Sequence, residues 1–71
     1  MMWILVALFE ITTVAMVIED IHVFEFQFNS ELDCLNFVTE NYEGLENYIK
    51  EEYQTKAETF VCVNAQRLNR D

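Results

Sequence analysis

The residues of this chain that most often act as nucleophiles or metal ligands are two cysteines and one histidine, namely Cys34, Cys62 and His22. A catalytic cysteine needs a base beside it, a structural zinc ion needs four clustered ligands, and a dithiol redox site usually has a C-x-x-C motif. One histidine and two well-separated cysteines match none of these patterns. We therefore predict no catalytic residue, no metal site and no cofactor, and we expect His22 to lie on a strand at a sheet edge.

Four polar residues recur along one face of the long helical segment: Glu40, Glu43, Asn47 and Glu51. Carboxylates act as general acids or bases where a cleft perturbs their pKa, and a chain of this size offers little room for a cleft. We interpret the row as a solvated face or as a surface for a protein partner. A further alternative is mimicry of nucleic acid, in which carboxylates take the place of phosphates in the basic groove of a host enzyme.

Composition and charge narrow the classes of function. The chain has 71 residues, of which 52% are hydrophobic, and its 13 acidic and 4 basic residues give a net charge of −9. All four basic residues lie in the last 22 positions. Such a surface repels phosphate groups, which argues against binding to nucleic acid or to an anionic membrane. Length and composition indicate one domain, residues 1–64, followed by a polar tail, residues 65–71.

The first 18 residues, MMWILVALFEITTVAMVI, are almost entirely apolar. A transmembrane helix needs about 20 apolar residues, and Glu10 would place a carboxylate near the middle of the bilayer, which is costly. An export signal has a positively charged start and a small-residue cleavage site, and neither is evident. The run MWILVALF is instead typical of a buried strand, followed by a turn over residues 10–13. Its alternate residues on one face are Ile4, Val6 and Leu8.

The segment HVFEFQF, residues 22–28, alternates between phenylalanine and other residues and predicts a half-buried strand. Glu19 and Asp20 precede it and are candidates for a bulge or kink. Residues 14–28 therefore form either one long bent strand or two short ones.

A long amphipathic helix follows. Ser30 or Asn29 can serve as its N-cap, and apolar residues then recur at spacings of three and four as far as Tyr53. The stripe passes through Gly44 without losing phase, so we predict one helix that bends or breaks near this glycine. ETFVCV, residues 58–63, predicts the last strand.

Together these elements predict an α+β fold, a small β-β-α-β domain with a three- to four-stranded sheet and one long amphipathic helix on one face. The helix connects two parallel strands, and the first strand lies between them. Because the helix starts and the last strand ends at the same edge of the sheet, Cys34 and Cys62 come close together. A disulfide would close a loop of about 29 residues and stabilise the fold by roughly 3 to 4 kcal/mol. Two reduced, buried thiols are the alternative.

The opposite face of the sheet has no helix to cover it. It carries its share of the apolar residues of the first strand, of which Ile4, Val6 and Leu8 are candidates for a dimer interface or for the core. A second copy of the chain is the simplest cover. We therefore predict a homodimer. The alternative is a monomer whose N-terminal residues fold back over the exposed face.

Three short patterns resemble those of very small proteins encoded by marine tailed phages and cyanophages. They are an opening MW with an apolar strand (MWILVALF), an F-x-S-x-x-x-C at a helix start (FNSELDC) and a late F-x-C-V strand (FVCV). The resemblance covers most of the chain, apart from the longer ITTVAMVIEDIH segment. The resemblance implies a viral accessory protein in which the two cysteines can be linked. It does not imply any biochemical activity.

These observations lead us to expect a non-enzymatic phage accessory protein in the host cytoplasm. It would act by protein–protein interaction as a homodimer, with a host or virion protein as a further partner. One alternative is a structural or decorating component of the virion, and another is an acidic nucleic-acid mimic that inhibits a host enzyme.

Overall fold

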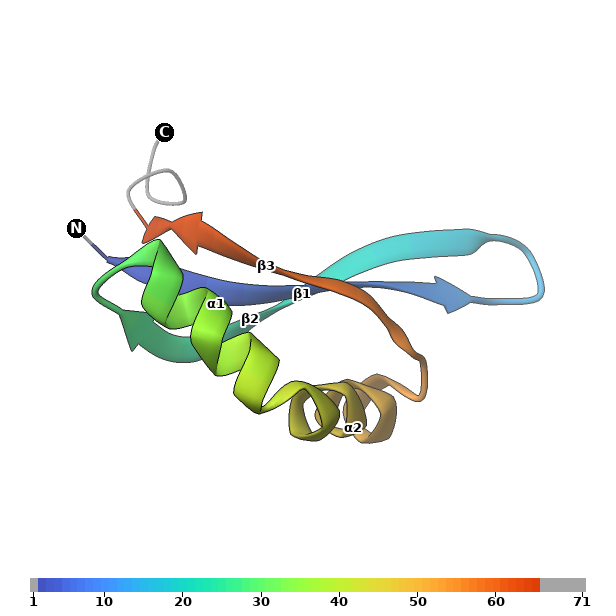
Figure 1. The fold of residues 1–71 in the computed structure, drawn as a ribbon. Coiled ribbons are helices and arrows are strands. Elements are labelled where there is room, and N and C mark those ends of the chain that lie inside the picture. Colours follow the sequence, from blue (N-terminus) through green and yellow to red (C-terminus); the bar gives the residue numbers. More distant parts are fainter. Residues whose placement is uncertain (1, 66–71) are drawn as a thin grey trace.

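The computed structural model describes residues 2–65, which form a sheet of three strands and two helices packed against it (Figure 1). In chain order the elements are β1 (Trp3–Thr12), β2 (Val17–Phe28), α1 (Glu31–Glu40), α2 (Tyr42–Tyr53) and β3 (Ala57–Asn64). The α+β class is confirmed. Of the predicted polar tail only Ala65 lies within the described residues, and its backbone N–H donates to the carbonyl oxygen of Met2 (2.8 Å).

β1 lies at the centre of the sheet, as its apolar residues on both faces predict. The strand order is β2-β1-β3, and β1 is antiparallel to both neighbours. β2 and β3 therefore run in the same direction on either side of β1, and each is an edge strand. Within residues 2–65 the sheet has three strands, so the four-stranded alternative is wrong.

The turn between β1 and β2 lies later than predicted. β1 continues through residues 10–12, and the chain reverses over residues 13–16. Thr13 closes this turn with its side chain, because its hydroxyl accepts from the backbone N–H groups of Ala15 (3.2 Å) and Met16 (3.0 Å). Its backbone N–H also donates to the Met16 carbonyl oxygen (2.8 Å). The threonine hydroxyl thus supplies the local hydrogen bonds that Asn-Gly often supplies in a hairpin.

β2 is a single strand of 12 residues. Glu19 and Asp20 pair with β1 in regular register, so the predicted kink at this point is wrong. The ladder is irregular further along, where residues 24–26 of β2 lie opposite Leu5 alone. Extra residues on one strand bend it and increase its twist, so the bend of β2 falls among its phenylalanines.

Two helices replace the single long helix that was predicted. Ser30 is the N-cap of α1, and its Oγ accepts from the backbone N–H of Asp33 (3.1 Å). The helix breaks at Asn41, three residues before Gly44. The Asn41 side-chain amide donates to the Phe37 carbonyl oxygen (2.9 Å), while the Asn41 carbonyl accepts from Leu45 and begins α2. An asparagine side chain that bonds the local backbone competes with the regular helix, which explains the position of the break.

Both helices pack against the same face of the sheet. On β1 the alternate residues Leu5, Ala7 and Phe9 are almost completely buried, and they meet Cys34 of α1 and Ile49 of α2. The core is small and consists of one layer between sheet and helices. β1 begins at Trp3, and within residues 2–65 no N-terminal segment lies over the opposite face.

Candidate interaction surfaces

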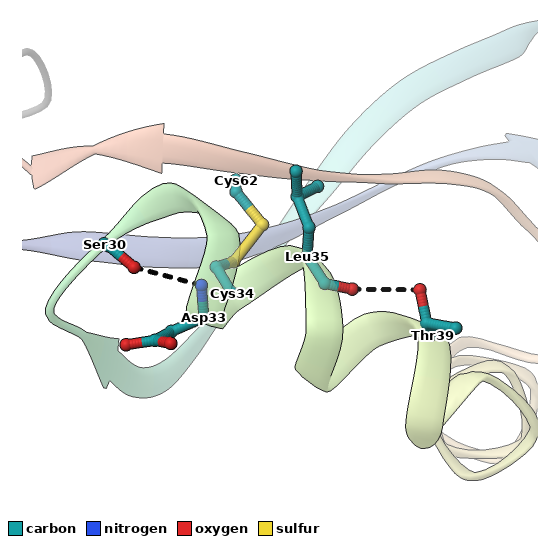
Figure 2. Close-up of a disulfide and its surroundings, with 6 residues drawn as sticks. All are labelled: Ser30, Asp33, Cys34, Leu35, Thr39 and Cys62. Atoms are coloured by element: carbon teal, nitrogen blue, oxygen red, sulfur yellow. Dashed lines mark hydrogen bonds between the residues drawn. A yellow bond between two sulfur atoms is a disulfide. The ribbon is translucent and has the colours of Figure 1, made fainter.

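Cys34 and Cys62 form a disulfide, with 6.1 Å between their Cα atoms (Figure 2). The reason is the topology: β2 ends at Phe28 and β3 ends at Asn64, and both of these residues pair with Trp3. The first turn of α1, which follows β2 directly, therefore lies beside the end of β3. The disulfide resolves the choice between a cross-link and two free thiols, and it leaves neither sulfur available as a thiolate nucleophile.

His22 lies on the edge strand β2, as predicted. It also belongs to an aromatic cluster, which was not predicted. Its Nδ1 is 2.5 Å from Tyr53 Oη, within hydrogen-bond distance. Its ring lies 4.6 Å from that of Phe24 and 5.2 Å from that of Tyr48, measured between centroids. Partial burial, and after it the negative charge of neighbouring groups, raise the pKa of Tyr53. The phenol is therefore protonated at neutral pH, and His22 is held by a neutral partner.

This aromatic cluster comes from two distant parts of the chain. β2 contributes the alternating rings Phe24, Phe26 and Phe28, and the helices contribute Phe37, Tyr48 and Tyr53. The alternation on β2 was visible in the sequence, and the spacing of five between Tyr48 and Tyr53 was hidden within the general apolar stripe. The contact between the two sets depends on the break at Asn41, which lies three residues before the glycine near which a bend or break was predicted.

A groove of about 560 Å³ runs between β2 and α2 beside this cluster. Its walls are residues 22–26 on one side and Gly44, Leu45 and Tyr48 on the other. Five consecutive residues of β2 line it, so the groove follows the outer edge of the strand. No residue of this groove had been predicted as a site residue.

The second surface is the face of the sheet turned away from the helices. Ile4, Val6 and Leu8 lie on it, with Val6 buried and the other two half-buried. The strand register extends this surface with the apolar residues that lie beside them, which are Ile21, Val23, Val61 and Val63. We call these seven residues the open face. No helix or strand within residues 2–65 covers it.

A hairpin arm, residues 11–18, projects beyond the helices (Figure 1). β3 pairs with β1 only as far as Phe9, so the arm is a ribbon of two strands. Four of its apolar side chains are exposed, namely Val14, Met16, Val17 and Ile18. A two-stranded ribbon has little stability of its own in water, and an exposed apolar ribbon favours a binding partner.

Three carboxylates gather at the junction between the open face and the arm. Glu10 and Glu19 are cross-strand partners, and the negative charge of Glu10 is the main cause that raises the pKa of Glu58 on β3. Partial burial and a hydrogen bond with Glu10 raise the Glu58 pKa further. Glu58 therefore accepts a proton more readily than an isolated glutamate.

The predicted polar row is divided by the helix break. Glu40 belongs to α1, whereas Glu43, Asn47 and Glu51 belong to α2. All four residues are exposed, but they do not form one regular helical stripe. Nor do they line the groove between β2 and α2.

Comparison of the chain with family models, with curated proteins and with solved structures finds no match.

Neither helix in residues 2–65 has the length and apolarity needed to span a bilayer.

Proposed function

We propose that this chain is a small, non-enzymatic binding protein, phage-encoded and located in the host cytoplasm, that self-associates through its open face and acts by protein–protein interaction. The observation that supports this most is the apolar open face, which all three strands build and no described element covers. Ile21 and Val23 on it are 50% and 45% exposed. Large apolar side chains that gather on one exposed face favour an interface.

The size of the molecule also favours a second copy. A standard interface takes about 800 Å² from each partner, which is about one-seventh of the 5406 Å² surface of one chain. The open face and the hairpin arm both expose apolar side chains on which such a contact can be built, and the carboxylates of Glu10 and Glu19 lie between them. Pairing would also support the arm, which lacks a third strand.

A non-enzymatic role is supported by the state of the residues that most often perform catalysis. The two sulfurs are bonded to each other, and the half-buried His22 ring packs beside aromatic rings, with Tyr53 as its polar neighbour. The nucleic-acid mimic receives less support, because the break at Asn41 separates Glu40 from the other members of the acidic row.

The test compares two substitutions from an apolar residue to lysine on opposite sides of the molecule. Ile21→Lys places a charge on the open face, and Leu32→Lys places the same charge on the exposed surface of α1. Both substitutions reduce the net negative charge equally. A difference in oligomeric state between the two variants therefore depends on where the added charge lies. Size-exclusion chromatography with light scattering should show a dimer for the wild type and for Leu32→Lys, and a monomer for Ile21→Lys. Dimers of all three proteins would contradict the open-face interface.

Detection of the protein in purified phage particles would favour the virion component over the accessory protein. Steep loss of binding to a basic host enzyme with increasing salt would favour the mimic.

A further inference from the structure

The groove between β2 and α2 exposes the main chain of an edge strand. β2 pairs with β1 on one side, and no described residue pairs with the backbone of residues 22–26 on the other side. Five consecutive strand residues line the groove, so both faces and the backbone edge between them are presented to it. An unpaired strand edge beside an apolar groove can accept an extended peptide as a further strand.

Gly44 lies in the wall of this groove, and the rest of the protein does not require a glycine there. A Cβ atom built on it would meet no atom within 4 Å, and its φ angle is not positive. Glycine is unfavourable within a helix relative to alanine. The residue thus leaves space open in the groove at a cost to α2 that neither packing nor backbone geometry explains.

Aromatic rings border the open space. Phe26 and Tyr48 remain 43% and 41% exposed, although Phe24 between them is buried. The Phe24 ring lies 5.8 Å from that of Phe26 and 5.6 Å from that of Tyr48, measured between centroids. The rings therefore form a preformed apolar binding site, and they need not rearrange to accept a ligand side chain.

The charge around the groove is negative. Glu25 lines it, and Glu51 and Glu52 follow Tyr48 by three and four residues, which places them next to it on the helix surface. Helical spacing places Lys50 on the other side of α2. Residues 2–65 hold only two lysines and no arginine. Positive charge on a ligand should therefore increase its affinity for this groove.

We propose that the groove binds an extended segment of a partner protein that pairs with the edge of β2. A bulky apolar side chain of the segment lies over Gly44 between Phe26 and Tyr48, and flanking lysines or arginines face Glu25, Glu51 and Glu52. The inference rests on the proposed role in protein–protein interaction and names the chemistry of the partner. It uses a different surface from self-association, since the groove lies between the outer edge of β2 and α2 and shares only Val23 with the open face.

The direct test is selection of a displayed random peptide library on the immobilised, full-length, disulfide-bonded protein. Enriched peptides should carry a bulky apolar residue flanked by lysine or arginine, and their affinity should fall as salt increases. Gly44→Leu fills the groove from a helix position that accepts leucine, and it should weaken the selected peptides by about tenfold or more. The matched controls Gly44→Ala and Leu32→Lys should bind within about threefold of the wild type. Circular dichroism and intact mass establish that each variant is folded and oxidised.

Several outcomes would overturn the proposal. They are the absence of enriched peptides, enrichment without basic residues, or equal binding to Gly44→Leu. Conversion of the dimer to a monomer by Gly44→Leu would show that a second copy occupies the groove instead. Ile21→Lys separates the two proposals, because peptide binding that survives in a monomeric Ile21→Lys protein supports the groove without the dimer interface.

Discussion

Cys34, in the first turn of α1, is bonded to Cys62 near the end of β3, and this cross-link joins the helical layer to the sheet at the end where all three strands meet in register. The sequence separation of 28 residues places α2 and most of α1 within the closed loop. Cys34 is fully buried. In a chain with a single thin core layer, the bond adds a covalent restraint between α1 and β3 to the packing of the core.

Loss of this disulfide should destabilise the protein substantially. For a loop of this length the chain-entropy model gives about 3 to 4 kcal/mol. Urea unfolding of the double variant Cys34→Ser/Cys62→Ser should show that loss in the free energy of unfolding, and reduced wild type should show a similar loss. Two thiols that can be alkylated in the native, unreduced protein would contradict the cross-link.

The N-cap of α1 contributes to stability through one hydrogen bond. Ser30→Ala removes the acceptor for the Asp33 backbone N–H and should lower the free energy of unfolding by about 1 kcal/mol. Ser30→Asp keeps an acceptor at the same place and serves as the control. Equal stability of the alanine variant and the wild type in chemical denaturation would show that the cap is not needed.

Gly44→Ala should increase stability. The added methyl group meets no neighbour within 4 Å, and alanine is favoured over glycine within a helix by up to about 1 kcal/mol. The melting temperature should rise, whereas Asn47→Ala on the same helix should change it less. A lower melting temperature for Gly44→Ala would mean that the groove closes over this residue in solution.

The pH dependence of the free energy of unfolding should reveal the raised pKa of Glu58. Its pKa in the folded protein is raised above the ordinary value of 4.5, chiefly by the charge of Glu10. In the folded state the proton therefore stays bound at pH values at which the unfolded chain has lost it. It follows that stability falls as pH rises from 4.5 through the raised pKa.

Glu58→Gln removes this titration. The variant should melt at a higher temperature than the wild type at neutral pH, and the difference should shrink as pH falls below 4.5. Added salt should also reduce it, because salt screens repulsion between exposed carboxylates. Thermal melts of the two proteins across this pH range measure the difference, and a constant difference would rule out coupling between Glu58 and Glu10.

Periodicity and local chemistry predicted much of the fold. The two apolar faces of residues 2–9 correctly indicate a central strand, and the alternation in HVFEFQF correctly indicates strand β2. Ser30 is correctly predicted as a cap because its chemistry is local. The proximity of Cys34 and Cys62 follows from the order of elements and needs no knowledge of side-chain packing.

The errors arise where a short-range interaction overrides a pattern that continues in phase. The apolar stripe runs through Asn41 without interruption, and α1 ends where the Asn41 side chain bonds the Phe37 carbonyl oxygen. Thr13 closes the hairpin with its hydroxyl, and that residue type is not a strong turn signal by itself. The aromatic groove needs β2 and α2 to meet, so its residues could not be grouped from spacing along the chain.

The most direct test of the central claim is the molar mass of the wild-type, disulfide-bonded protein in solution. Sedimentation equilibrium at micromolar concentration should give twice the 8.5 kDa mass of one chain, because we propose that a second copy covers the open face. A single species of 8.5 kDa that persists across the concentration range would contradict self-association.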